Sequence, residues 1–277
     1  MIDFIGIGAQ KSGTSWVHAC LFEHPEVCSP IKEIHFFSRE RFARGRGWYE
    51  DHFKTCESGK KKGEFSTSYL YSPSTAEKIA LLYPEVRIIA ILREPTDRAY
   101  SQYRNAIKAG EIVQSIDFSE YFKMEKSCME QGLYTGQLER YYTYFNQEQV
   151  LVLLYEESKE NPEAFIQKIY RHIGVDDTFV PPSLNMHINV ARTPKHTGID
   201  KVMHIVAEWL RRHGASSLVH IIKRSGMTDA VRKVNTKEDT GGFCDLSLYR
   251  KYFSDDIRDL SSLLECDVNT KWNYEKG

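Results

Sequence analysis

The sequence lacks the features that mark several common classes of protein. Its 37 basic and 38 acidic side chains give a net charge of −1, so we expect no general attraction to nucleic acid or to an anionic membrane. It has no run of about 18 uncharged apolar residues, and its first residues carry neither a basic segment nor a long apolar one. These absences predict a soluble, cytoplasmic protein without nucleic-acid or membrane partners.

Patterns typical of metal and redox sites are also missing. The six cysteines are scattered without a Cys-x-x-Cys pair, and the ten histidines without a His-Glu-x-x-His motif. Zinc sites and thioredoxin-type sites use such close spacings. We therefore expect no metal site, and thiols that are reduced and mostly structural.

The sequence does contain an alternation of short apolar runs with helical patterns. Extended segments are predicted at 3–8, near 27–28, and at 64–68, 86–92 and 150–154, with helices between them. The continuously apolar run VRIIAIL is typical of a strand buried on both faces of a parallel sheet. For 277 residues this order predicts a single α/β domain with three layers, a parallel sheet between helices. Residues 193–234 are predicted to form a C-terminal helical lid.

The first apolar run leads into the stretch GIGAQKSGTSW. A glycine-bearing turn between a strand and a helix offers backbone N–H groups and the positive end of the helix dipole to an anion. The stretch is not a Walker loop, because Lys11 stands before Gly13 and not after it. Where ATPases carry a magnesium-binding aspartate at a strand end, this chain has Arg93. The sequence thus predicts two anion sites, at Lys11 and Arg93; an ion pair of Arg93 with Glu94 or Asp97 is the alternative.

Two anionic groups without a metal are what adenosine 3′-phosphate 5′-phosphosulfate (PAPS) presents. The stretch GAQKSGTSW resembles the 5′-phosphosulfate loop of PAPS-dependent sulfotransferases, and LREPTDRAYSQY resembles their 3′-phosphate motif. The segments PIKEIHFFS and GRGWYEDHF are similar to the heparan sulfate sulfotransferase branch and its bacterial relatives. The resemblance covers about residues 3–175. It implies a P-loop-like sulfotransferase fold, PAPS as donor, and adenosine 3′,5′-bisphosphate (PAP) as product, without a metal.

The resemblance also implies roles for individual residues. Lys11 would stabilise the charge that develops on the leaving phosphate. Glu33 would accept the proton of the acceptor, with His35 as an acceptor contact or the alternative base. The implied donor-binding residues are Lys11, Ser12, Gly13, Thr14, Ser15, Trp16, Arg93 and Ser101, with Arg192 or Lys195 closing over the nucleotide.

One position departs from the heparan-type pattern, in which a lysine commonly stands where this chain has Phe65. The departure favours a small metabolite or natural-product alcohol over a polysaccharide as acceptor. A saccharide hydroxyl and a nitrogen acceptor both stay open, and no oligomeric state is predicted.

Two other functions were weighed against sulfuryl transfer. A P-loop nucleotide kinase or NTPase would need the Walker lysine and the strand-end aspartate that this chain lacks. A non-catalytic nucleotide-binding protein would have no use for the combination of Lys11 with Glu33. The sequence therefore favours an enzyme of the sulfotransferase class.

Overall fold

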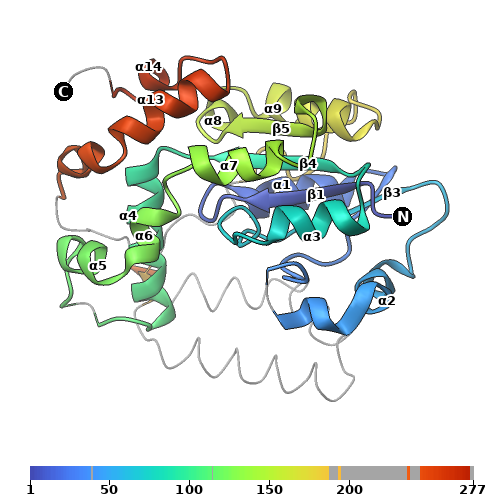
Figure 1. Ribbon diagram of the computed structural model, residues 1–277, viewed down its shortest axis with the longest axis horizontal. Coiled ribbons are helices and arrows are strands. Elements are labelled where there is room, and N and C mark those ends of the chain that lie inside the picture. Colours follow the sequence, from blue (N-terminus) through green and yellow to red (C-terminus); the bar gives the residue numbers. More distant parts are fainter. Residues whose placement is uncertain (39, 114, 187–192, 195–235, 238–243, 275–277) are drawn as a thin grey trace. The chain divides into compact units, whose positions relative to one another are not determined.

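The structure of the chain is a computed structural model (Figure 1). It describes residues 1–38, 40–113, 115–186 and 244–274, together with the backbone at 193–194 and 236–237. The chain divides into two compact units: Met1–Gln102 with Phe122–Ile188 and Asp245–Gly277, and Tyr103–Tyr121 with Asn189–Cys244. The predicted lid lies almost entirely outside the described residues, so the lid and the single domain stay predictions.

A five-stranded parallel sheet forms the centre of the first unit. Its strands are β1 (Phe4–Gly8), β2 (Val27–Cys28), β3 (Lys61–Phe65), β4 (Arg87–Leu92) and β5 (Val150–Leu154). They lie in the order β2-β3-β1-β4-β5, and every neighbouring pair is parallel. All of β1, and β4 after its first residue, are buried, because the sheet is covered on both faces. The parallel sheet predicted from the apolar runs is confirmed.

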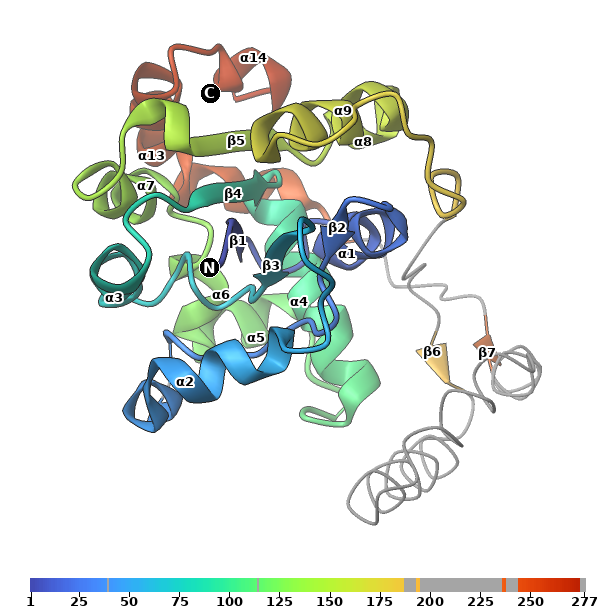
Figure 2. The same ribbon diagram turned by 90° about the vertical axis from the view of Figure 1, so that its right-hand side faces the viewer.

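Helices cover the two faces of this sheet (Figure 2). On one face, α1 (Thr14–Glu23) and α9 (Pro162–Ile173) bury their apolar side chains in one core together with side chains of β1, β4 and β5. On the other face lie α3 (Thr75–Leu82) and α7 (Thr135–Tyr142). The predicted three-layer arrangement is therefore confirmed for the first unit.

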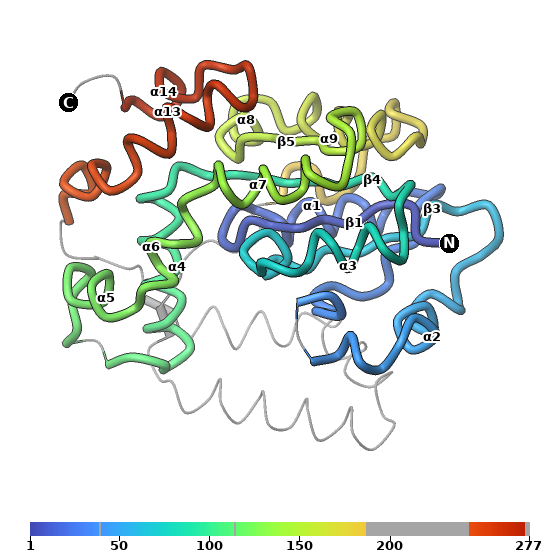
Figure 3. Tube along the Cα trace, in the orientation of Figure 1, coloured from blue at the N-terminus to red at the C-terminus, as the bar shows by residue number. Residues whose placement is uncertain are grey.

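The remaining elements are α2 (Gly45–Glu50), α4 (Pro95–Ala109), α5 (Phe118–Met124), α6 (Lys126–Glu130), α8 (Glu157–Glu160), α13 (Ser254–Leu263), α14 (Val268–Lys271) and 3-10 turns at Glu40–Arg44, Asp51–Phe53, Gln147–Gln149 and Leu246–Tyr252. The C-terminal helices belong to the first unit, where α13 packs beside α7 (Figure 3). The Asp256 carboxylate makes this contact by accepting hydrogen bonds from the amides of Tyr134 (2.7 Å) and Thr135 (3.2 Å).

The second unit is described in part. The Tyr103 hydroxyl donates to the Ile116 carbonyl oxygen over 2.8 Å, and the Tyr103 ring packs against Phe118 and Tyr121. The short strands β6 (Thr193–Pro194) and β7 (Thr236–Lys237) pair antiparallel.

The position of β3 differs from the prediction. A strand was expected at 64–68, but β3 includes Lys61 and Lys62 and ends at Phe65. Asp3 accounts for the shift, because its carboxylate accepts a hydrogen bond from the Lys62 amide (2.9 Å) and lies 3.5 Å from Lys61 Nζ. Residues 66–70 therefore form the connection that follows the strand.

Candidate active site

The predicted site residues follow the carboxyl ends of the strands. Lys11 follows β1, Glu33 follows β2, and Arg93 follows β4 directly. In a parallel sheet these ends meet along one edge, which is where open α/β proteins bind their ligands. The topology therefore brings residues from distant motifs to one side of the first unit.

The turn between β1 and α1 has the backbone of an anion site. Lys11 and Gly13 both adopt left-handed conformations, with φ of 70° and 79°. Gly13 is required there for a second reason, since a Cβ atom would lie 2.7 Å from the ring of Tyr155. The Ser12 side chain is fully buried, and its Oγ makes no hydrogen bond to any described residue. The first amides of α1 have no acceptor within the helix, so they and Ser12 Oγ are available to an anion.

Arg93 is in direct contact with this turn. Its Nη1 donates to the Lys11 carbonyl oxygen over 3.1 Å, and its Nη2 lies 3.9 Å from the Asp97 carboxylate. The Nε atom is buried and has no hydrogen-bond partner among the described residues. The Asp97 contact is at the limit of an ion pair and does not saturate the guanidinium. The two predicted anion sites, at Lys11 and Arg93, thus adjoin each other.

Ser101 and Trp16 occupy different surroundings. Ser101 is partly buried, roughly two turns into α4, the helix that begins just after Arg93. The Trp16 side chain packs in the core, where its Nε1 donates to the carbonyl oxygens of Ser183 and Leu184, each at 3.1 Å. Thr14 and Ser15 are the first two residues of α1. Arg192 and Lys195 lie outside the described residues.

Tyr155, at the end of β5, was not predicted as a site residue. Its ring lies against Gly13, and the ring centroid is 5.2 Å from the Arg93 guanidinium carbon and 4.8 Å from Lys159 Nζ. Such cation–π contacts hold a guanidinium in one orientation without using its N–H groups. The one sequence feature that could have indicated Tyr155 as a site residue is its position, as an aromatic residue directly after a buried strand.

Glu33 is held in an extensive set of hydrogen bonds on the neighbouring part of the edge. Its carboxylate accepts from the Thr67 amide (3.0 Å) and Thr67 Oγ1 (3.0 Å), and lies 2.6 Å from Lys32 Nζ. His35 Nε2 is 3.2 Å from the same carboxylate, and His35 Nδ1 is 2.8 Å from Ser68 Oγ. The Glu33 side chain is 30% exposed, so it is fixed in place yet open to an incoming group.

His18 of α1 approaches the same segment. Burial lowers the pKa of His18 to about 4, and the nearby Lys32 cation acts in the same direction. The His18 ring is therefore neutral at pH 7, and its Nε2 is buried without a hydrogen-bond partner in the described part of the chain. It places an uncharged polar atom beside the Lys32–Glu33 pair, which sequence patterns did not indicate.

Phe65 takes a position in the core. It is fully buried, and a Cβ atom at Gly6 would lie 2.0 Å from its ring, so the glycine on β1 makes room for the aromatic side chain on β3. Phe65, which stands in place of the heparan-type lysine, is thus part of the packing between two adjacent strands.

The expectation of reduced thiols is wrong for one pair. Cys28 and Cys56 form a disulfide, with their Cα atoms 5.8 Å apart. The two residues are 28 positions apart in the sequence, so only the fold brings them together. The bond closes the segment that contains Glu33 and His35. Among the described residues, Cys20, Cys128 and Cys266 are free.

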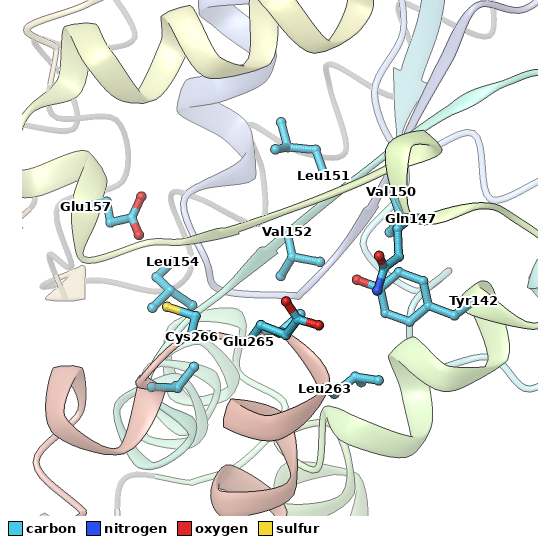
Figure 4. Close-up of a pocket in the computed structure, with 12 residues that line it drawn as sticks. Tyr142, Gln147, Val150, Leu151, Val152, Leu154, Glu157, Leu263, Glu265 and Cys266 are labelled. Carbon is cyan, nitrogen blue, oxygen red and sulfur yellow. The ribbon is translucent and has the colours of Figure 1, made fainter.

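A cavity of about 330 Å³ lies elsewhere in the first unit, between β5 and the turn that joins α13 to α14 (Figure 4). Its polar lining comes mainly from Gln147, Glu157 and Glu265 and includes none of the predicted site residues. Within the described ranges, no group of three or more potential metal ligands is clustered. None of the helices in those ranges has the length and apolar character needed to cross a bilayer.

The fold and the site define an α/β protein whose turn after the first strand is suited to an anion. Comparison with known proteins names the family: residues 2–201 match the sulfotransferase domain model. The chain belongs to the sulfotransferase family. A nucleotide kinase or NTPase is not favoured.

The similar proteins agree with this membership. The bifunctional heparan sulfate N-deacetylase/N-sulfotransferase 3 of Homo sapiens is 29% identical over 193 residues, which is 62% of this chain and 22% of that protein. The corresponding enzyme 2 of Bos taurus is 30% identical over 192 residues, with the same coverage. This chain thus spans 22% of the length of these relatives. A crystal structure of a sulfotransferase from Alicyclobacillus acidocaldarius matches 99% of both chains with a TM-score of 0.71 at 24% identity, which shows the fold.

Proposed function

We propose that this sulfotransferase moves a sulfuryl group from PAPS to a hydroxyl or amine of a small-molecule or saccharide acceptor. The observation that carries the proposal is the contact between the two anion sites, in which Arg93 Nη1 donates to the Lys11 carbonyl oxygen over 3.1 Å. A donor with a 5′-phosphosulfate and a 3′-phosphate needs two such sites side by side. The proposal assigns no role to a metal.

The donor side fits this ligand in its unsatisfied polar atoms. Ser12 Oγ and Arg93 Nε are both buried and have no hydrogen-bond partner among the described residues. Unpaired buried polar atoms are costly, so both atoms are accounted for if an anion binds there. We assign Lys11 and the amides of 12–15 to the 5′-phosphosulfate, and Arg93 with Ser101 to the 3′-phosphate.

The acceptor side fits proton removal. As sulfur is transferred, the acceptor oxygen or nitrogen must lose a proton, and the Glu33 carboxylate is partly exposed to receive it. Thr67 fixes the carboxylate, and Lys32 and His35 lie beside it. We assign Glu33 as the base and His35 as the residue that contacts the acceptor, with His35 as base the alternative.

Both acceptor classes remain within the proposal. The relatives are named as N-sulfotransferases of heparan sulfate, which favours an amine. The buried Phe65, in place of the lysine of the heparan-type pattern, favours a smaller and less anionic acceptor.

Three predictions are carried forward without a test in the described residues. These are the lid at 193–234, closure of the donor site by Arg192 or Lys195, and a cytoplasmic location. Against the last stands the Cys28–Cys56 disulfide, because such bonds persist mainly in oxidising compartments.

Calorimetry with PAP and AMP tests the donor assignment. We expect PAP to bind far more tightly, because AMP offers no 3′-phosphate to Arg93. Equal affinities would overturn the assignment. A screen with PAPS and a panel of alcohols, amines and N-deacetylated heparan oligosaccharides then identifies the acceptor class; PAP binding without turnover on any acceptor would favour a non-catalytic nucleotide-binding protein.

A further inference from the structure

The residues that hold Glu33 and His35 lead to one more assignment. Both residues have positive φ, 63° and 54°, a conformation that non-glycine residues seldom adopt. The segment 33–37 therefore depends on external hydrogen bonds for its shape. Its first amide, that of Glu33, donates to the Phe65 carbonyl oxygen over 2.8 Å.

The next amides are bound by side chains from β3 and the residues after it. The His35 amide donates to Ser66 Oγ over 2.9 Å. The Phe36 amide donates to the Tyr69 hydroxyl over 2.9 Å, and the Phe37 amide approaches the same hydroxyl at 3.5 Å. Two hydroxyl groups thus accept main-chain hydrogen bonds of the segment that presents the candidate base.

Both hydroxyl groups donate hydrogen bonds to one carboxylate, that of Glu64. Ser66 Oγ donates to Glu64 Oε2 over 2.7 Å, and the Tyr69 hydroxyl donates to Oε1 over 2.6 Å. The Ile34 amide reaches Oε2 directly at 3.3 Å, and the Tyr49 hydroxyl reaches Oε1 at 3.3 Å. Glu64 is 0% exposed, which is unusual for a carboxylate that has no cationic partner among the residues the structure describes.

The direction of these hydrogen bonds is fixed by the backbone. A main-chain amide can only donate a hydrogen bond. Ser66 Oγ and the Tyr69 oxygen therefore accept from the His35 and Phe36 amides, and each donates its own hydrogen bond to Glu64. A carboxylate accepts at both oxygens, whereas an amide or a carboxylic acid would place a hydrogen against a donor. All four donors are satisfied together only by an ionised Glu64, because a protonated Glu64 requires one of them, the Tyr49 hydroxyl, to turn from donor to acceptor.

We propose that Glu64 is a positioning residue for sulfuryl transfer, which anchors the segment 33–37 and so sets the placement of Glu33 and His35. It touches neither donor nor acceptor. Its catalytic part rests on the proposed function, whereas its anchoring of the segment can be measured without any activity.

The test compares Glu64→Gln with the wild-type chain of 277 residues. Glutamine has nearly the same shape, but its NH₂ group turns one of the two acceptor oxygens into a donor. We expect hydrogen exchange of amides 34–37 to rise by about tenfold or more, since one set of their partners is lost. Displacement of a reacting group by a fraction of an ångström to 1 Å lowers turnover by up to about 10²-fold, so we expect a fall of ~10–100-fold. The dissociation constant for PAP should stay within about twofold, because the donor side has its own contacts.

Substitutions that remove only one hydrogen bond each keep the test informative if Glu64→Gln folds poorly. Ser66→Ala removes the partner of one amide, and Tyr69→Phe removes the partner of Phe36. Each should raise exchange at its own amide and lower turnover less than Glu64→Gln does. Asp256→Asn is the matched control, since Asp256 also accepts two main-chain amides but lies away from this segment. It should leave exchange of 34–37 and turnover unchanged.

The outcomes separate the two proposals. Unchanged exchange of 34–37 in Glu64→Gln overturns the anchoring role. If Glu64→Gln shows raised exchange but normal turnover, while Glu33→Gln is inactive, then Glu64 anchors the segment but is not a positioning residue for sulfuryl transfer. If Glu33→Gln is as active as wild type in the same assay, the assignment of the base has failed, and raised exchange in Glu64→Gln still supports the anchor.

Discussion

The donor side and the acceptor side of the candidate site are built in different ways. The donor side consists of the turn 9–13, Arg93 and Tyr155, which lie within one to five residues of strand ends and are held by backbone and ring contacts. The acceptor side, around Glu33 and His35, is held by a buried carboxylate, two hydroxyls and a disulfide.

The difference shows which part of the site is independent of its surroundings. A turn between a strand and a helix takes its shape from the two elements it joins. The segment 33–37 has no such elements and takes its shape from side chains of another part of the chain. Substitutions that disturb the acceptor side should therefore leave donor binding intact.

The largest effect is expected from Glu33→Gln. Glutamine keeps the size of the side chain but cannot accept the proton of the acceptor, so turnover should fall by about 10²–10⁴-fold. Affinity for PAP should barely change. Steady-state kinetics and calorimetry check the two halves. His35→Ala should instead raise the acceptor Michaelis constant more than it lowers turnover; an active Glu33→Gln with an inactive His35→Ala would show that His35 is the base.

Loss of the disulfide should come next. Closing a loop of 28 residues stabilises a fold by about 3.5 kcal/mol in the chain-entropy model. Cys28→Ser with Cys56→Ser should lower the free energy of unfolding by that amount, measured in denaturant, and reductant should act only on the wild type. Cys266→Ser, which changes a free cysteine, is the control. Since the disulfide lies on the acceptor side, a large loss of PAP affinity in the folded double variant would contradict the separation.

Arg93→Ala probes the donor side. Hydrogen bonds to charged groups contribute about 1.5–3 kcal/mol, so the preference for PAP over AMP should fall by roughly 10- to 150-fold. Arg87→Ala is the matched control, because Arg87 stands at the opposite, exposed end of the same strand. Calorimetry with both nucleotides measures the ratio. Retention of the full preference would mean that the 3′-phosphate binds elsewhere.

The smallest effect is a pH dependence of the acceptor segment. Burial raises the pKa of Glu64 to about 7, with the Glu33 carboxylate adding to the rise, while hydrogen bonds from Tyr69, Ser66 and Ile34 oppose it. As the pH falls from 8 to 6, exchange of amides 34–37, corrected for its intrinsic pH dependence, should rise a few-fold. The rise is small because the Tyr49 hydroxyl, which has no other hydrogen bond among the described residues, can turn to accept the new proton.

The same titration predicts the opposite trend for global stability. A pKa of about 7 in the folded chain, above the usual 4.5, means that the folded state binds this proton more tightly than the unfolded state. The contribution of Glu64 to stability is therefore greatest below pH 4.5 and is lost as the pH rises through about 7. Glu64→Gln should abolish both trends; a pH dependence of segment exchange that persists in this variant would exclude Glu64 as its source.

The sequence predicted the fold and the donor side better than the acceptor side, for a physical reason. Strands, turns and the residues that follow them depend on neighbours in the sequence. The strand VRIIAIL and the Lys11–Gly13 turn could therefore be recognised from the sequence alone. Glu64 and Tyr69 look like an ordinary strand residue and a core aromatic when each is taken alone. Only the fold brings them to one point, and the same is true of Cys28 and Cys56.

The pairing of Gly6 with Phe65 limits which residues position 65 can accept. The aromatic ring on one strand fills the space that the missing side chain on the next strand leaves. Replacing Phe65 by lysine would bury a charge and open a void in the same step, each of which destabilises a core. A lysine at this position therefore requires at least two simultaneous substitutions, which a search by single mutations, whether in evolution or in a library, would not find.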